Sequence, residues 1–352
     1  MTGLAIALFG ASGLHGTSVA MVLGLLALAL VAFPVCRRWC TLLPNRNPGP
    51  NAGMPASSTY RPSVLYCAGI WRLGQFAVSL LPQRFSDILG GLISGIYFAL
   101  QPRRRSIVIE NMLPIVGGDL SAAKAASRRL FRKFGSKVVG LLRHEAGAPI
   151  DYSMMDWSGG EILLNAKAKG HGVLMVTVHL GDWEIGGAQV ANLGVKLVVL
   201  SQAEPGNGFT AMRQSSRARW GIETIVVGSD AFAFVDVIKR LQCGEVVALL
   251  IDRPPPSSSA TVTLFGRPFR ASISAAELAR VTGCTLLPVY VVRGSHGFCA
   301  HVLPEVYYDR RALGSREARV VLTQEIMRAF EPAIRQYCDQ WYHFVPIWPH
   351  GE

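Results

Sequence analysis

The sequence predicts an α/β fold, a mixed sheet flanked by helices, preceded by one N-terminal transmembrane helix. Beyond about residue 150, short runs of Val, Ile and Leu alternate with helical stretches, as in a sheet covered on both faces. At the other end, residues 1–36 contain no Asp, Glu, Lys or Arg. Half of the 352 residues are hydrophobic and 16% are charged, which excludes a disordered chain and argues against a freely soluble enzyme.

The chain is also basic. Its 35 Lys and Arg residues outnumber 23 Asp and Glu residues, which gives a net charge of +12. A chain that is both basic and apolar indicates an anionic membrane surface, or an acidic partner that docks there. Nucleic acid is disfavoured as a partner because the aromatic residues do not interleave with the basic runs.

Residues 1–40 are predicted to be a membrane anchor. The apolar stretch 16–35 has about the length that a helix needs to span a bilayer. Arg37 and Arg38 follow it at once, and the positive-inside tendency places this flank in the cytoplasm. A buried core helix is the alternative. Residues 41–62 are rich in Pro, Asn, Gly and Ser, which predicts a linker.

Residues 63–150 are predicted to form a helical, membrane-associated region. The apolar run 88–100 is too short to span a bilayer and suits a helix in the membrane interface or under the main domain. Within 121–147, apolar residues recur every three to four positions among Lys and Arg, which indicates a basic amphipathic helix. Its basic face is either solvated or turned towards anionic lipid or an acidic carrier.

Residues 151–352 are predicted to form the α/β core. Expected strands are 173–178, 196–200, 223–227, 246–251 and 286–292. Expected helices are 183–193, 209–220, 231–242 and 272–282. Active sites in such sheets gather at the carboxyl ends of the strands. No Gly-x-Ser-x-Gly, phosphate-binding loop, Gly-x-Gly-x-x-Gly or His-Glu-x-x-His pattern is present, which disfavours the enzyme classes that use them.

A histidine and a glutamate stand at the end of the first expected strand. The run 173–187 brings His179 to the carboxyl end, and Glu184 follows five residues later across a strand–turn–helix junction. Such a junction can bring a carboxylate to an imidazole, where it fixes the tautomer and stabilises the imidazolium. The other ring nitrogen can then take a proton from a hydroxyl group. We predict catalysis by this pair; a structural histidine is the alternative.

The spacing His-x-x-x-x-Glu resembles the motif of the lysophospholipid acyltransferase superfamily. It is most similar to the bacterial lipid A branch, the lauroyl and myristoyl acyltransferases, to which mycobacterial phosphatidylinositol mannoside acyltransferases also belong. Five further blocks resemble this family in the same order, at 103–115, 216–225, 244–256, 264–293 and 338–348. The resemblance covers roughly 63–350 and implies a lysophospholipid/glycerol-phosphate acyltransferase-like fold.

The resemblance implies a membrane-bound O-acyltransferase. The donor would be a thioester of acyl carrier protein or CoA, and the acceptor a hydroxyl of a membrane glycolipid or lysolipid. The protein would be located in the bacterial inner membrane, with a single-pass anchor and a cytoplasmic catalytic domain. No cofactor or metal is implied. A lysophospholipid acyltransferase, a lipid esterase and a non-catalytic scaffold on the same fold are the alternatives.

The same resemblance implies an arginine for phosphate binding. Arg217, with Arg219 as its alternate, matches the arginine of the family's second block. A guanidinium group is suited to gripping a phosphate of the donor or acceptor. The alternative for either residue is a charge on a helix surface.

Four more residues complete the predicted substrate site. Asp252 ends a buried strand and would support the site or bind the acceptor; its alternative is a turn cap. Phe265, Gly266 and Arg267 match the family's Phe-Gly block and would line the acyl or phosphate cleft. A turn between two strands is the alternative for these three.

Overall fold

The computed structural model describes residues 68–148, 155–204, 208–227, 232–295 and 297–349. The predicted anchor at 1–40 and linker at 41–62 lie outside them. Among the described helices, none combines the length and apolarity needed to cross a bilayer. The described part of the chain belongs to one unit, in which the helical region and the α/β core pack together.

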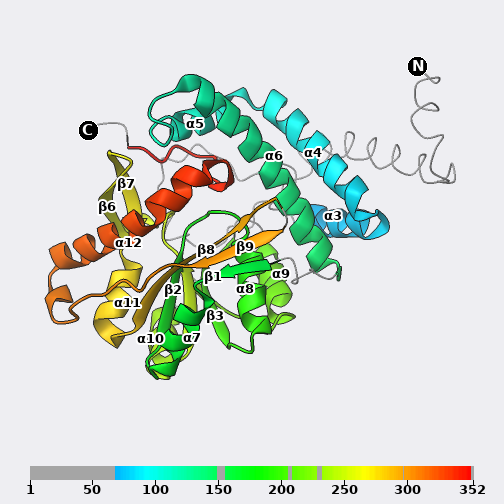
Figure 1. The fold of residues 1–352 in the computed structure, drawn as a ribbon. Helices are drawn as coiled ribbons and strands as arrows, with labels where there is room; N and C mark the ends of the chain where they lie inside the picture. The colour runs from blue at the N-terminus through cyan, green and yellow to red at the C-terminus, as the bar shows by residue number, and fades with distance from the viewer. Residues whose placement is uncertain (1–67, 149–154, 205–207, 228–231, 296, 350–352) are drawn as a thin grey trace, which may run out of the picture. The chain divides into compact units, whose positions relative to one another are not determined.

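A seven-stranded sheet forms the centre of the core (Figure 1). Its order is β1-β9-β8-β2-β5-β3-β4, and neighbouring strands are parallel except β8 and β9. The predicted mixed sheet is therefore confirmed, and it is mostly parallel. The strands are β1 (Met155–Ser158), β2 (Val173–Thr177), β3 (Leu197–Gln202), β4 (Glu223–Val227), β5 (Val246–Leu250), β8 (Thr285–Arg293) and β9 (Phe298–Val302).

In the described ranges, six helices and a hairpin surround the sheet. The helices are α7 (Gly160–Ala168), α8 (Trp183–Asn192), α9 (Phe209–Ala218), α10 (Ala233–Gln242), α11 (Ser274–Thr282) and α12 (Arg316–Gln336). The hairpin consists of β6 (Ser259–Leu264) and β7 (Arg267–Ser272). All five predicted strands and all four predicted core helices are confirmed; α10 begins at Ala233, and residue 231 lies outside the described part.

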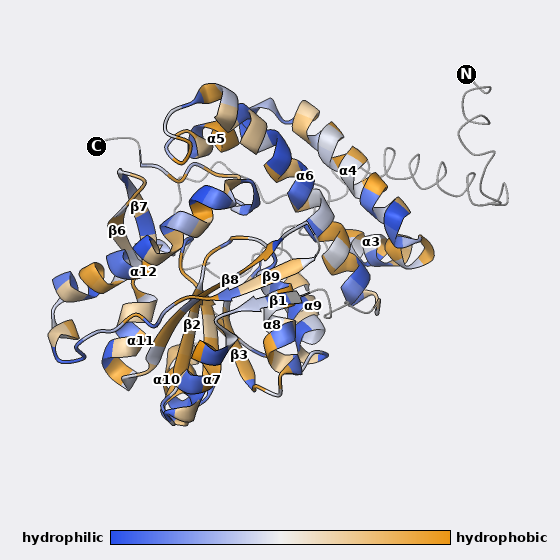
Figure 2. Ribbon diagram, viewed as in Figure 1, coloured by the Kyte–Doolittle hydropathy of each residue, from blue (hydrophilic) through white to orange (hydrophobic). Residues whose placement is uncertain are grey.

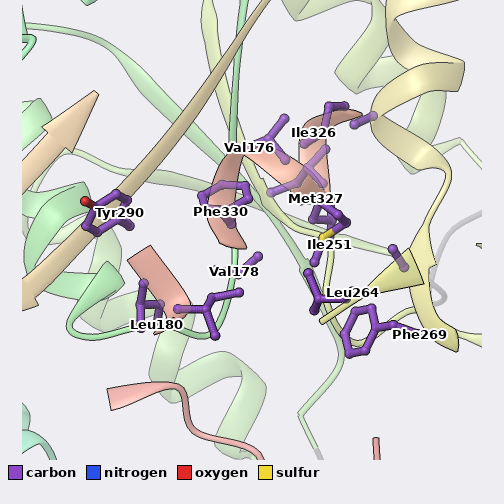
Figure 3. Packing of buried hydrophobic residues seen from close by; sticks show 14 of the residues in the cluster. Val176, Val178, Leu180, Ile251, Leu264, Phe269, Tyr290, Ile326, Met327 and Phe330 are labelled. Atoms are coloured by element: carbon purple, nitrogen blue, oxygen red, sulfur yellow. The ribbon is translucent and has the colours of Figure 1, made fainter. Parts of the chain in front are cut away.

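Strand β2 is buried on both faces because helices cover both sides of the sheet. Leu174 and Val176 belong to the larger core with residues of α10, α11 and α12, whereas Val173 and Met175 pack with residues of α7 and α8. Figure 2 shows β2 and β3 as mostly hydrophobic, and Figure 3 shows Val176 close to side chains of α12. The end of β2 is thus held firmly from two sides.

Four described helices precede the sheet: α3 (Ala68–Leu80), α4 (Gln83–Leu100), α5 (Pro102–Met112) and α6 (Leu120–Glu145). The predicted basic amphipathic helix is confirmed as α6, whose N-cap Asp119 accepts hydrogen bonds from two backbone amides. Three of its basic residues have partners within the protein. Arg129 and Lys133 bind the carboxylate of Asp339 at 3.0 and 2.9 Å, and Lys137 is buried.

The C-terminal segment lies against the end of β2. The amide of Gly181 donates to the carbonyl oxygen of Gln340 at 2.8 Å, and the amide of Tyr342 donates to that of His179 at 2.9 Å. On the other side, the amide of Ser272 at the end of the hairpin donates to the carbonyl of Ile251 at 2.7 Å. Residues distant in sequence therefore surround the carboxyl ends of β2 and β5.

Candidate active site

His179 and Asp252 lie at the same edge of the sheet because of the strand register. Strands β2 and β5 are parallel neighbours, and Thr177 is paired with Leu250. Each of the two site residues lies two positions beyond a member of that pair, so the register places them opposite each other. The distance between His179 Nδ1 and Asp252 Oδ1 is 2.6 Å.

The other carboxylate oxygen of Asp252 is surrounded by N–H donors. Its Oδ2 atom accepts from the backbone amide of His179 at 2.8 Å and from Nε1 of Trp341 at 2.9 Å. Nε2 of His343 also lies 2.9 Å from it. An ionised carboxylate only accepts hydrogen bonds, so Nδ1 of His179 carries the proton towards Asp252, and its Nε2 keeps the lone pair.

Burial and charge set the protonation of this pair. Burial would raise the pKa of Asp252, but the two histidines hold it well below its usual value. Burial lowers the pKa of His179 to about 4; the charge of Arg253 acts in the same direction, and Asp252 opposes both. The side chain of His179 keeps an exposed fraction of 17%, while that of Asp252 is fully buried. At neutral pH the site therefore holds a neutral, reachable imidazole on an ionised carboxylate.

Glu184 does not take the position that the sequence analysis gives it. It lies in the first turn of α8 and faces α9, where Arg217 donates to it from Nε at 3.0 Å and from Nη2 at 2.6 Å. Arg213 lies 2.7 Å from the same carboxylate. The predicted contact of Glu184 with the imidazole is corrected: Asp252 orients His179. Glu184 is five residues from His179 in the sequence and Asp252 is 73 residues away, but the sheet register places Asp252 in contact with the imidazole.

Of the two arginines of the second block, Arg217 lies in the interior and Arg219 is exposed. Arg217 is buried, and the two nitrogens that bind Glu184 are donors that the prediction assigns to a phosphate. Arg219 donates to the backbone carbonyl of Glu145 at 2.9 Å. Burial would raise the pKa of Glu184, but Arg213 and Arg217 hold it well below its usual value. These guanidinium groups therefore neutralise buried carboxylates.

The Phe-Gly block is not brought to His179. Phe265 and Gly266 form the turn of the β6–β7 hairpin, and the amide of Phe265 donates to Glu331 on α12 at 2.8 Å. Phe269 on β7 lies beside the rings of Trp341 and His343, at 5.9 and 6.5 Å between centroids. Phe265 precedes Phe269 by four residues, so at about 3.4 Å per residue the turn lies roughly 13 Å from Phe269, at the far end of the hairpin. Arg267 is exposed at the same turn.

Three residues of the site are not predicted. Trp341 and His343 lie in a C-terminal segment that resembles the family, which is the only signal for them in the sequence. Lys137 on α6 has no such signal. Its Nζ donates to the carbonyl of Gly181 at 2.6 Å and lies 2.8 Å from the centroid of the Trp183 ring. Burial lowers its pKa well below the usual value.

A cavity of about 230 Å³ lies beside the turn that follows His179. It contains groups of both charges, and Asp182 in its wall pairs with Arg293 at 3.6 Å. Its walls are formed by Asp87, Lys133, Ser136, Asp182, Arg293, Gln340 and Tyr342. Within the ranges that the structure describes, no cluster of three or more His, Cys, Asp or Glu residues could hold a metal ion.

Comparison with known proteins supports the resemblance. Residues 60–349 match the family model described as bacterial lipid A biosynthesis acyltransferase. Two curated relatives are phosphatidylinositol mannoside acyltransferases of Mycobacterium tuberculosis, from strains CDC 1551 / Oshkosh and ATCC 25618 / H37Rv. Each is 26% identical over 186 residues, covering 52% of this chain and 56% of the relative. The chain therefore spans about half the length of these relatives.

Proposed function

The chain belongs to the bacterial lipid A biosynthesis acyltransferase family, and from that premise we propose that it transfers a fatty acyl group to a hydroxyl group of a bacterial glycolipid. The match of residues 60–349 to the family model confirms the family resemblance seen in the sequence. The donor in this proposal is an acyl thioester of acyl carrier protein or CoA. A glycolipid acceptor is supported by the relatives, which are phosphatidylinositol mannoside acyltransferases by name.

In the proposed reaction, Nε2 of His179 removes the proton from the acceptor hydroxyl. The alkoxide oxygen attacks the thioester carbonyl, and the new C–O ester bond forms as the C–S bond breaks. The proton on the imidazolium then passes to the leaving thiolate, so that His179 is restored. Asp252 keeps the ring in the required tautomer and stabilises the positive charge while the ring is protonated.

The pair of His179 and Asp252 carries this proposal. Their 2.6 Å contact leaves one ring nitrogen for the substrate, and the 17% exposed fraction of the histidine allows a substrate to reach it. The three donors on Oδ2 fix the carboxylate, so that Oδ1 is presented to the imidazole. A preorganised carboxylate costs no reorganisation when the imidazolium forms.

We also propose a membrane location. The uncharged residues 1–36 followed by Arg37 and Arg38 support a single-pass anchor in the bacterial inner membrane, with the catalytic part in the cytoplasm. The net charge of +12 supports contact with anionic lipid or an acidic carrier protein. Arg129 and Lys133 contribute less to such contact than α6 alone would suggest, because Asp339 binds both.

The test is acyl transfer by the full-length chain in vesicles. Radiolabelled acyl groups are supplied on acyl carrier protein or CoA, and the acceptors are a mannosylated phosphatidylinositol, a lipid A precursor and a lysophospholipid. We expect transfer to a glycolipid, and its loss in a folded His179→Ala protein. Transfer to the lysophospholipid alone would favour the alternative acceptor class. Release of free fatty acid without transfer would identify an esterase.

A further inference from the structure

Helix α4 exposes a row of large apolar side chains and buries small residues, which is unusual for a helix in water. Its buried residues are the small Ser86, Gly90 and Ser94, spaced four apart. Five of its large apolar residues face outward, with exposed fractions between 46% and 68%, whereas Tyr97 and Phe98 near its end pack on Phe131 of α6. We call these five residues the outer face of α4: Ile88, Leu92, Ile93, Ile96 and Leu100. A surface helix of a water-soluble protein shows the opposite arrangement.

The inward side of α4 packs on α6 as helices do in lipid. A Cβ atom added at Gly135 of α6 would lie 1.8 Å from Oγ of Ser94, and one added at Gly90 would lie 2.6 Å from a methyl group of Val139. The two backbones therefore approach at small residues. Close approach at Gly, Ala and Ser, with large apolar residues directed outward, is the arrangement of helices surrounded by acyl chains.

Basic residues border the outer face of α4. Arg84 is exposed in its first turn, and Arg103 is exposed just beyond its end. Helix α3, which packs on α6 as α4 does, also exposes the apolar Leu73, Phe76 and Leu80, and Arg72 is exposed next to Leu73. An apolar helix face flanked by Arg is complementary to a bilayer that contains anionic lipid.

We propose that the outer face of α4 lies in the plane of the membrane, with its side chains among the acyl chains and its flanking arginines at the phosphates. This rests on the proposed function and adds a route for the acceptor. Asp87 of α4 and Asp182, three residues after His179, line the same cavity. The proposed route places the acceptor headgroup in this cavity, beside the turn that follows His179, while its acyl chains stay in the bilayer beside α4.

The occupant of this face can be identified with a nitroxide spin label at position 96. The label is attached to Ile96→Cys in the full-length chain after Cys36, Cys40, Cys67 and the exposed Cys243 are replaced by Ser. The matched control is Val321→Cys on α12, which is similarly exposed and apolar. The protein is reconstituted in phosphatidylcholine–phosphatidylglycerol vesicles. Collisions of the label with oxygen, which concentrates in lipid, and with a water-soluble nickel complex are then measured.

We expect frequent oxygen collisions and few nickel collisions at position 96, and the reverse at 321. Few collisions with either reagent at 96 would mean that protein covers the face, whether a second copy or residues 1–67, and would overturn the proposal. Frequent nickel collisions would mean exposure to water and would overturn it too. This measurement needs no activity, so it can fail or succeed independently of the proposed acyl transfer.

A pair of variants then tests the acceptor route. Leu92→Glu with Ile96→Glu should raise the KM for a vesicle-embedded acceptor at least about tenfold, with kcat for a dispersed short-chain acceptor unchanged. Val321→Glu is the control and should change neither value. Equal KM values for the embedded acceptor in the double variant and the control would overturn the route.

Discussion

Nδ1 of His179 lies 2.6 Å from Oδ1 of Asp252, a carboxylate 73 residues further along the chain. The two residues leave adjacent parallel strands at equivalent positions. In the proposed mechanism the carboxylate orients the imidazole and balances the charge that develops on it. This relationship, rather than the spacing of His179 and Glu184, determines what substitutions at the site should do.

The first prediction concerns Asp252→Asn. The amide keeps the size of the carboxylate but loses the charge that stabilises the imidazolium, so kcat should fall about 10²–10⁴-fold. The measurement is acyl transfer at saturating substrate, with thermal melting to check folding. His179→Ala should show a similar loss, and the double variant should be little worse, because the two residues act as a unit. A folded Asp252→Asn protein with normal kcat would contradict the mechanism.

The second prediction concerns pH. The base must be neutral, and burial lowers the pKa of His179 to about 4. Activity limited by this residue should therefore persist below the ordinary histidine pKa of about 6.5 and fall as pH drops through about 4. The measurement is kcat/KM across this range. A fall centred near pH 6.5 would show that the imidazole is not held as the structure indicates.

The same shift predicts how stability depends on pH. Between about pH 6.5 and 4 the unfolded chain binds a proton at His179 that the folded chain excludes, so the free energy of unfolding decreases as pH falls. The slope from one such group approaches about 1.4 kcal/mol per pH unit. His343, whose pKa is also lowered by burial, acts in the same direction. His179→Gln should flatten the dependence measured by urea denaturation.

The third prediction separates Glu184 from the chemistry. Glu184→Gln removes the charge that faces Arg213 and Arg217 in the interior, so the free energy of unfolding should fall by about 3 kcal/mol. The acid limb of kcat/KM should keep its position, because Asp252 remains on His179. Glu161→Gln, at an exposed glutamate in the first turn of α7, is the matched control and should change neither quantity. A shifted acid limb in Glu184→Gln would restore its predicted role.

Much of the fold is predictable because the buried strands are short apolar runs with clear ends. Glu223–Val227 matches its predicted strand at both ends. The strand Phe298–Val302 is not predicted, because its partly exposed residues give no continuous apolar run. The helix Arg316–Gln336 is not predicted either, because its interior Pro332 and its many charged residues obscure the apolar periodicity.

The sequence predicts His179 and Asp252 as individual site residues, but it does not predict that they contact each other. Both His179 and Asp252 are recognisable as residues that end buried strands. That β5 rather than β3 lies beside β2 is a property of the sheet order, which strand patterns do not contain. Glu184 is favoured in the sequence by its nearness to His179. His343 and Trp341 contact Asp252 although they lie 91 and 89 residues away in the sequence, and no local sequence pattern predicts such contacts.

The last prediction concerns the turn that holds His179. Gly181 has a φ of 65°, and a Cβ atom there would lie 1.9 Å from the carbonyl oxygen of Val291. That oxygen accepts a hydrogen bond from the amide of Asp182 at 2.7 Å, so it cannot move without breaking the contact between the turn and β8. Gly181→Ala should therefore lower the free energy of unfolding by more than the cost of a positive φ alone, which is about 1–2 kcal/mol.

Gly194→Ala is the matched control, because its φ is 76° and no atom would lie within 4 Å of the new Cβ. Urea denaturation of both variants isolates the effect of the close approach, and acyl transfer should fall in Gly181→Ala alone, since only that turn positions His179. Equal losses of stability with normal transfer in both variants would show that the turn tolerates a side chain and that His179 is held by other contacts.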